Sequence, residues 1–425
     1  MSFSNVIDCL KERGFIDAVT SEEIREKLKH PLRVYVGFDP TADSLHLGSL
    51  VGIIALSWFQ RYGHTPVVIL GGATGRIGDP SGKSQERPLL DSQTIAYNIA
   101  RIRDHFEKVL DFNHPKTKPL MLNNEDWFSR ISLIDFLRDV GKHFRLQAML
   151  AKDSVRARLE SEEGLSFTEF TYQLLQAYDF YYLHTEYGVS IQMGGSDQWG
   201  NITAGTELVR KLAGESVYGL TFPLLTKSDG KKFGKTEGGA IWLAPDRTSP
   251  YQFYQYLVRV ADSDVIKLMR MITFMDIDEI RRYEEEMKRS DYVPNRAQKR
   301  LAEEVTRLIH GEEGLQVALR VTETAAPGSQ ASLDVERLEA IALEMPNVVL
   351  ASSEVMGEKF VDLMAKTGLT PSKGEALKLL KNGGAYLNEQ KVDDQTLRIQ
   401  PEHLIGNRYL LLGMGKKKKL LLKVE

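Results

Sequence analysis

The chain has 425 residues, of which 42% are hydrophobic, so it is long enough for about three domains with buried cores. Its single cysteine, Cys9, excludes an internal disulfide. No leader and no apolar run of about 18 residues is evident, so we expect a soluble cytoplasmic protein. The net charge is −3, yet residues 357–425 hold 13 Lys and Arg against 8 Asp and Glu, which predicts a basic C-terminal domain with an anionic partner.

Residues 34–50 (VYVGFDPTADSLHLGSL) have the pattern of a strand that turns into a helix, with Ser44 as the expected N-cap. Such a turn points free backbone N–H groups and the positive end of the helix dipole at a ligand, which suits phosphate. Gly48 would let a nucleotide approach the backbone, and His46 could donate a hydrogen bond while neutral. A core helix with one satisfied histidine fits this stretch equally well.

Further strands are predicted at residues 65–72 (TPVVILGG), near 119–127 (PLMLNNEDW) and at 189–195 (VSIQMGG), with helical patterns between them. This alternation indicates the α/β class with a parallel sheet, whose ligands sit beyond the carboxyl ends of the strands. The loop 73–87 (ATGRIGDPSGKSQER) follows one such end and carries Asp79, Lys83 and Arg87, which could bind phosphate or simply be solvated.

A predicted helix at residues 167–183 places Tyr172, Gln176 and Asp179 on one face. The rest of this helix is apolar nearly all round, which indicates that it is buried. A buried carboxylate beside phenols fits a pocket for a small ligand with a polar tip, although a structural hydrogen-bond network is the alternative.

Two loops are candidates for nucleotide contacts. Residues 227–239 (KSDGKKFGKTEGG) combine lysines with glycines, which suits a mobile clamp on phosphate charge but would also suit solvated lysines on a turn. In residues 194–200 (GGSDQWG), Asp197 could hold ribose hydroxyls or serve as a plain helix cap. No Cys/His cluster predicts a zinc site, and no GxSxG pattern predicts acyl hydrolysis.

Together and in this order, these motifs resemble a bacterial tyrosyl-tRNA synthetase, of the class I aminoacyl-tRNA synthetases. HLGS (residues 46–49) stands where the family carries its HIGH signature, and KFGKT (residues 232–236) where it carries KMSKS. The pairing with YVGFDPTADSLH, GGATGRIGDPSGKSQER, FTYQLLQAYDF and QMGGSDQWGN makes the resemblance specific. It implies ATP-dependent activation of tyrosine to tyrosyl-adenylate and transfer of the tyrosyl group to tRNA(Tyr).

The resemblance also implies residue roles. Tyr35 and Asp179 would contact the substrate phenol, with Gln192 near the carboxylate side. The ammonium group would be held by Asp79, Tyr172 and Gln176. The ATP site would be lined by Gly37, Asp39, His46, Gly48, Ser49, Gly195, Asp197, Gln198 and Lys235. Thr41 and His46 would stabilise the α-phosphate, and the pyrophosphate would be gripped by Lys83, Arg87, Lys232, Lys235 and Thr236. Ser49 departs from the family, where His or Asn is usual, so its ribose contact is in doubt.

The resemblance divides the chain into a Rossmann-like catalytic domain (1–245), an all-helical domain (246–325), a linker (326–356) and a small α+β RNA-binding domain (357–425). In the last domain Ser372 and Glu375 would open a helix whose Lys373, Lys378 and Lys381, with the lysines at 416–419, contact phosphates. A solvated lysine face is the alternative. A homodimer is expected from the resemblance alone.

The implied reaction needs alignment and charge stabilisation and no protein nucleophile. Magnesium is expected to arrive with ATP, since no carboxylate cage for a resident metal is evident. Three other functions remain open at this point: a tryptophan-activating relative, a nucleotidyltransferase with a similar histidine, and a non-catalytic RNA-binding paralogue.

Overall fold

The computed structural model describes residues 3–81, 89–160, 164–236, 239–324, 335–342, 346–415 and 418–425. The chain divides into two compact units. The first comprises Met1–Arg247 and Val260–Ile309, and the second comprises Thr248–Arg259 and His310–Glu425. The division into domains at residues 245, 325 and 356 stays a prediction.

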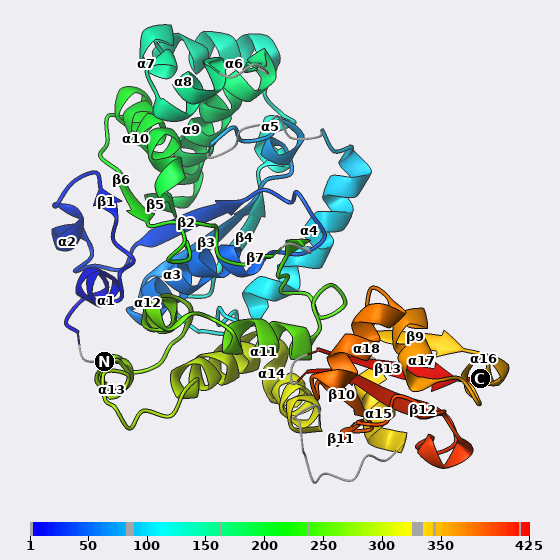
Figure 1. Ribbon diagram of the computed structural model, residues 1–425. Coiled ribbons are helices and arrows are strands. Elements are labelled where there is room, and N and C mark those ends of the chain that lie inside the picture. The colour runs from blue at the N-terminus through cyan, green and yellow to red at the C-terminus, as the bar shows by residue number, and fades with distance from the viewer. Residues whose placement is uncertain are drawn as a thin grey trace. The chain divides into compact units, whose positions relative to one another are not determined.

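A six-stranded sheet lies at the centre of the first unit (Figure 1). Its strands are, in spatial order, β1 (Ala18–Val19), β6 (Tyr218–Phe222), β5 (Val189–Gly195), β2 (Arg33–Phe38), β3 (Thr65–Leu70) and β4 (Leu120–Asn123). Only β1 pairs antiparallel among these strands, so the expected α/β class with a parallel sheet is confirmed. The strand order reverses at β2, and a crevice for a ligand forms at such a switch point.

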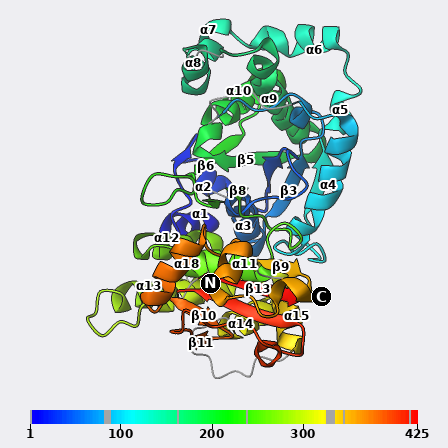
Figure 2. The ribbon, with the colours of Figure 1, turned by 45° about the vertical axis from the view of Figure 1, so that its right-hand side comes forward.

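Helices cover both faces of this sheet, with α9 (Phe167–Tyr187) and α10 (Trp199–Ala213) on one face and α3 (Leu50–Arg61) on the other (Figure 1, Figure 2). Successive strand residues point to opposite faces, so Tyr35 packs on Phe180 of α9 while Val36 lies against Gly52 of α3. No helix in the described ranges has both the length and the apolar character needed to span a bilayer. The remaining helices of this unit are α1 (Val6–Glu12), α2 (Ile24–Lys27), α4 (Ser92–Glu107), α5 (Glu125–Phe128), α6 (Leu133–Asp139), α7 (Leu146–Leu150), α8 (Asp153–Leu159), α12 (Asp262–Ile272) and α13 (Ile277–Glu286).

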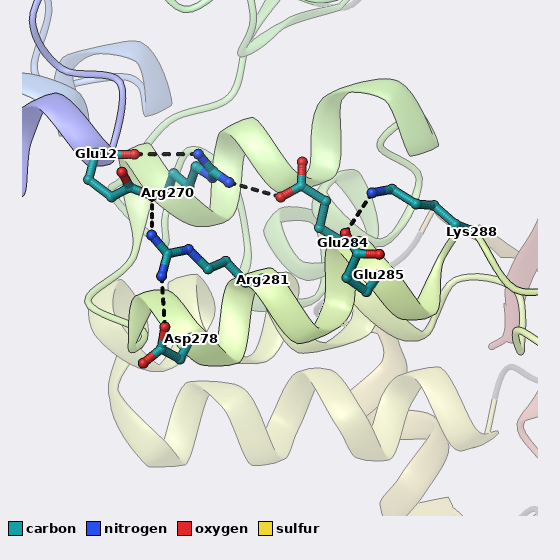
Figure 3. Close-up of polar contacts among 7 residues, drawn as sticks. All are labelled: Glu12, Arg270, Asp278, Arg281, Glu284, Glu285 and Lys288. Carbon is teal, nitrogen blue, oxygen red and sulfur yellow. Dashed lines mark hydrogen bonds and ion pairs between the residues drawn. The ribbon is translucent and has the colours of Figure 1, made fainter.

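Two arginines join α12 and α13 to α1 within the first unit by a hydrogen bond and an ion pair (Figure 3). Arg270 of α12 donates to Glu284 of α13 at 2.9 Å and to the Glu12 backbone carbonyl at 3.4 Å. Arg281 of α13 bridges the Glu12 carboxylate at 2.7 Å and Asp278 at 2.9 Å. These two arginines therefore fix both helices against the N-terminal helix.

Two predicted helix caps are wrong. Ser44 does not cap a helix: its hydroxyl donates to the Leu45 carbonyl and accepts the Ala244 N–H. His46 instead caps a 3₁₀ turn, Leu47–Ser49, that leads into α3. Asp197 likewise lies inside the 3₁₀ turn Ser196–Gln198 that precedes α10 and is not its cap.

The second unit contains a five-stranded sheet in the order β11 (Gln390–Lys391), β10 (Ala385–Leu387), β12 (Tyr409–Met414), β13 (Lys418–Val424) and β9 (Asn347–Leu350). Leu410 and Leu412 of β12 pack with the helices α17 (Phe360–Lys366) and α18 (Lys373–Lys381). The alternate residues Tyr409 and Leu411 pack on the other face with Val321 and Leu338. This two-sided core matches the expected small α+β fold.

The other helices of the second unit are α11 (Pro250–Val258), α14 (Arg296–Thr324, which begins in the first unit), α15 (Val335–Ala342) and α16 (Ser352–Val355). Together with α12 and α13, they make residues 250–324 largely helical, as expected for the all-helical part of the chain (246–325), and α14 breaks at Gly311, whose φ is 72°. The predicted linker 326–356 includes α15, β9 and α16, while its first residues, up to 334, lie outside the described part of the chain.

Candidate active site

A cavity of about 340 Å³ opens at the carboxyl ends of β2 and β5, where the strand order reverses. It is lined by fifteen of the side chains and glycines singled out from the sequence. They are Tyr35, Gly37, Asp39, Thr41, His46, Gly48, Ser49, Asp79, Tyr172, Gln176, Asp179, Gln192, Gly195, Asp197 and Gln198.

Tyr35 and Asp179 lie at a buried part of the cavity wall. Tyr35 of β2 stands beside Gln192 of β5 in register, and its ring packs edge-on against Phe180 at 5.3 Å between centroids. Among the described residues, neither the Tyr35 hydroxyl nor the Gln192 Oε1 atom has a hydrogen-bond partner. Buried polar atoms without partners are costly, so this wall of the cavity is matched to a ligand that hydrogen-bonds.

Asp179 of α9 is only 4% exposed and is held by two neutral donors. The Asn124 amide donates to Oδ2 at 3.1 Å, and the Trp127 indole N–H donates to Oδ1 at 2.8 Å. Burial raises the pKa of Asp179 to about 8, although both hydrogen bonds favour the ionised form and lower it. Within the described part of the chain, no Lys or Arg forms an ion pair with it.

Asp39, which follows β2, is bonded through both carboxylate oxygens. The Thr74 hydroxyl donates to Oδ1 at 2.7 Å, and the Tyr172 hydroxyl donates to Oδ2 at 2.8 Å. A Cβ atom at Gly71 would lie 2.0 Å from Asp39 Oδ1, so this arrangement requires glycine at position 71. Burial and the charge of Asp39 raise the pKa of Tyr172 well above its usual value, which keeps this phenol a donor.

A second carboxylate, Asp79, is held from α10 and its preceding turn. Gln198 donates its Nε2 to Asp79 Oδ2 at 2.6 Å, while the Ser81 N–H donates to Oδ1 at 3.0 Å. Asn201 donates to the Gln176 Oε1 atom at 3.1 Å. This bond links Gln176 on α9 to the start of α10. The acceptor oxygens that line the cavity here surround a space suited to an ammonium group.

The opposite part of the cavity is formed by the turn that precedes α3. The Ser49 backbone N–H donates to Nδ1 of His46 at 3.2 Å, and the Ser49 hydroxyl lies 3.3 Å from the same atom. Because Nδ1 accepts, a neutral ring carries its proton on Nε2 and can donate from there. A Cβ atom on Gly48 would lie 3.1 Å from the His46 ring, so glycine leaves room for the ring.

The lysine loop, residues 227–236, is attached to this same turn. The Leu47 N–H donates to the Ile241 carbonyl and the Ile241 N–H donates to the Gly234 carbonyl, both at 2.8 Å. Lys232 and Lys235 are exposed and do not line the cavity, and Lys235 with Thr236 forms β7, which pairs with β8 (Gly239–Ala240). Nothing is described of the Thr236 side chain, and Lys83 and Arg87 lie outside the described residues.

Two family profiles match the chain. The family described as tRNA synthetases class I (W and Y) matches residues 26–325, and the tyrosine–tRNA ligase C-terminal domain matches residues 337–422. The tyrosine–tRNA ligase of Protochlamydia amoebophila is 60% identical over 421 residues, which cover 99% of both chains. The chain belongs to the tyrosine–tRNA ligase family of class I synthetases.

Other members of the tyrosine–tRNA ligase family agree with this assignment. The ligase of Escherichia fergusonii is 48% identical and covers 98% of both chains. Among solved structures, the C-terminally truncated mitochondrial tyrosyl-tRNA synthetase of Aspergillus nidulans is 32% identical, with a TM-score of 0.66, and covers 74% of this chain and 92% of that one. The corresponding Coccidioides posadasii enzyme is 34% identical, with a TM-score of 0.65, and covers 74% and 91%.

Residues that the sequence reasoning missed support the site of this tyrosine–tRNA ligase family member. Thr74, Asn124 and Trp242 line the cavity, and Trp127 bonds to Asp179. Thr74 and Asn124 follow the carboxyl ends of β3 and β4, and this position is the signal that could have identified them. Trp242 comes into place through a β-bridge with His46, for which the sequence holds no local signal.

The candidate RNA-binding lysines lie in the second unit. Lys373, Lys378 and Lys381 are exposed on α18, and Lys373 forms an ion pair with Asp362 at 2.5 Å. Lys416 and Lys417 lie outside the described residues. Lys419 is buried beside Glu389, so the phosphate contact expected of it is wrong; strand alternation in β13 turns Lys419 inward and leaves Lys418 exposed.

Proposed function

We infer that the chain is an ATP-dependent tyrosine–tRNA ligase, which activates tyrosine as its adenylate and transfers the tyrosyl group to tRNA(Tyr). The observation that carries the proposal is the single cavity with two unlike ends. One end offers buried acceptors and an unpartnered phenol, and the other is the start of a helix. An amino acid with a phenol side chain suits the first end, and phosphates suit the second.

At the first end, Tyr35 and Asp179 would bind the substrate hydroxyl, which can accept from one and donate to the other. Asp79, Tyr172 and Gln176 would hold the ammonium group, with Gln192 near the carboxylate. This assignment is supported by the carboxylates of Asp79 and Asp179, which no arginine or lysine among the described residues neutralises.

At the second end, the tyrosine carboxylate would attack the α-phosphate while Thr41 and His46 stabilise the five-coordinate state. A neutral His46 that donates from Nε2 suits this role, and Ser49 favours that tautomer in addition to any ribose contact. The adenylate would be held by Gly37, Asp39, Gly48, Ser49, Gly195, Asp197 and Gln198.

The pyrophosphate would leave between the helix start and the lysine loop. Lys232, Lys235 and Thr236 would grip it from the loop, and Lys83 and Arg87 from residues 73–87. Magnesium would arrive bound to ATP and would offset phosphate charge. Among the described residues, no group of His, Cys, Asp or Glu side chains is placed to hold a metal ion of its own.

For the second unit we propose RNA contacts through Lys373, Lys378 and Lys381 on α18, and a domain division at residues 245, 325 and 356. The exposed position of these lysines supports phosphate contacts, whose affinity would fall with salt. We also propose a cytoplasmic location, as suits a relative of bacterial ligases.

We further propose a homodimer formed by a second copy of this chain against an apolar face of the first unit. The side chains of Leu133 and Ile134 on α6, Leu146 on α7 and Phe167 at the start of α9 are exposed, Phe167 by 78%, and these three helices share a buried apolar cluster. Exposed apolar groups gathered on neighbouring helices mark an interface. Light scattering should show a dimer for the native chain and a monomer for Phe167→Asp; a monomeric native chain would contradict the proposal.

The proposed function is tested by ATP–pyrophosphate exchange with each amino acid in turn. Exchange should depend on tyrosine, and phenylalanine and tryptophan should support little. Comparable exchange with tryptophan would favour the tryptophan-activating alternative. Exchange that needs no amino acid would favour a nucleotidyltransferase. No exchange by a folded protein that still binds RNA would favour the non-catalytic paralogue.

A further inference from the structure

The lysine loop has a second attachment, to α12. Asp264, in the first turn of α12, accepts the Ser228 backbone N–H through Oδ1 at 2.9 Å. Its Oδ2 lies 3.5 Å from the Ser228 hydroxyl, which itself accepts from Ser263 at 3.0 Å. Asp264 is only 7% exposed, so this is a buried carboxylate whose acceptors face the loop.

The contact falls on the tight turn that opens the loop. The Gly230 N–H donates to the Lys227 carbonyl at 2.9 Å, and the Lys227 N–H donates to the Lys231 carbonyl at 2.8 Å. Gly230 has a φ of 80°, as a glycine after a type I turn has in a three-residue hairpin loop. Ser228 is thus the second residue of the turn (position i+1), and fixing it fixes the hairpin that carries Lys231 and Lys232.

α12 can serve as a fixed support because its far end is also bound. Arg13, which directly follows α1, is buried and donates to the carbonyls of Arg270 at 3.2 Å, of Thr273 at 3.3 Å, and of Met275. Arg270 adds the bonds to Glu12 and Glu284 described above (Figure 3). α12 also packs against α3, the helix that follows the His46 turn.

We propose that Asp264 is a positioning residue for the adenylation step. Through Ser228 it holds the lysine loop in the same rigid frame as α3, so that Lys232 and Lys235 stand at a defined place relative to His46. This role rests on the proposed function. On the cavity side, the Gly234 carbonyl bonds to Ile241, and Asp264 adds an attachment at the turn itself, so its loss should let the turn move relative to the helix start. Misplacing a charge-stabilising group by about 1 Å costs on the order of 100-fold in rate.

The sharpest variant is Ser228→Pro, because proline is favoured at this turn position but has no N–H to donate. It removes the bond to Asp264 without altering α12. Asp264→Ala removes the same bond from the other side, and the double variant tests whether both act through it. Asp262→Ala is the matched control: it also removes a negative charge from the first turn of α12, but Asp262 bonds to Gln298 and, among the described residues, has no bond to the loop.

The measurements are the kcat and KM of tyrosine-dependent pyrophosphate exchange, tyrosine affinity by calorimetry, and tryptic cleavage in the loop. Ser228→Pro and Asp264→Ala should each lower kcat by about 10- to 100-fold and speed cleavage after Lys231 or Lys232, with tyrosine affinity within about twofold of native. The kcat of the double variant should fall no further than that of either single variant. Asp262→Ala should have the kcat and the cleavage rate of the native chain.

Native kcat in a folded Ser228→Pro would overturn the proposal, as would additive losses in the double variant or an equal loss in Asp262→Ala. If Asp264→Ala fails to fold, the comparison of kcat between Ser228→Pro and the native chain is sufficient to test the proposal. Lys235→Ala separates this proposal from the proposed function. If exchange survives Lys235→Ala, the lysine loop has no role in the chemistry; if it is lost there but kept in Ser228→Pro, only the role of Asp264 fails.

Discussion

If Asp179 binds the substrate phenol as proposed, the affinity for tyrosine should depend on pH near neutrality. Burial raises its pKa from 3.8 to about 8, while the bonds from Asn124 and Trp127 lower it. At pH 7 the free protein therefore holds this carboxyl about nine-tenths protonated. A protonated carboxyl is a poorer acceptor for the substrate phenol than a carboxylate, so tyrosine binding should favour the ionised form.

The size of the effect follows from that pKa. If only the ionised form binds, the apparent affinity is reduced by the fraction that is ionised. That fraction falls about tenfold for each pH unit below 8. Tyrosine should thus bind about tenfold more weakly at pH 7, and about 100-fold more weakly at pH 6, than well above pH 8. The sign is fixed: affinity rises with pH.

Calorimetric titration of tyrosine between about pH 6 and pH 8.5, in buffers with different ionisation enthalpies, measures both the affinity and the protons released. Up to one proton per tyrosine should be released below pH 8, and none well above it. The variant Asp179→Asn should bind tyrosine weakly with a flat profile, and its ATP affinity should be unchanged. A flat profile in the native chain, or proton uptake, would refute the reasoning.

Three substitutions test other parts of the structure. Lys235→Ala should lower pyrophosphate exchange about 10²- to 10³-fold with tyrosine affinity unchanged, because it removes charge that acts only as pyrophosphate leaves; an unaltered exchange rate would contradict this. Trp127→Phe removes the 2.8 Å bond to Asp179 and should weaken tyrosine binding about tenfold at constant ATP affinity, as calorimetry with each ligand can check. Lys419→Ala leaves Glu389 buried without its partner and should lower the free energy of unfolding of the second unit by about 3–5 kcal/mol, as denaturant unfolding can measure. A decrease in that free energy below about 1 kcal/mol would show that water compensates the charge of Glu389.

The parts of the fold that could be predicted carry a local signature. β2, β3 and β5 are runs of apolar residues, and α9 is apolar on nearly all sides except for one face that carries polar residues. The site followed from these elements because the carboxyl ends of parallel strands meet at one edge of a sheet. Tyr172, Gln176 and Asp179 line the cavity for that reason, although their chemical roles came from the resemblance to a family.

What could not be predicted depends on contacts between distant residues. Ser44 has a typical capping side chain, but its hydroxyl bonds to the Ala244 N–H, 200 residues away, and His46 caps the turn instead. Trp127 reaches Asp179 only because β4 lies at the edge of the sheet beside β3. In the sequence, Asp264 has the position of an ordinary acidic residue in the first turn of a helix. The neighbouring residues do not indicate that its oxygens face the lysine loop.

The donors around Asp179 explain how the cavity can select a phenol. A cation paired with Asp179 would lower its pKa but would compete with the substrate for the carboxylate; Asn124 and Trp127 orient the oxygens and leave lone pairs on each. A substrate phenol can donate to Asp179 and accept from the unpartnered Tyr35 hydroxyl at once. An indole N–H can donate to Asp179 but cannot accept from Tyr35, and a phenyl ring can do neither. Tryptophan would therefore leave the Tyr35 hydroxyl without a partner, and phenylalanine would in addition make no bond to Asp179. An unsatisfied buried hydroxyl costs about 1–3 kcal/mol, and the missing bond to Asp179 adds to this for phenylalanine. Hydrogen bonding should therefore discriminate more strongly against phenylalanine than against tryptophan.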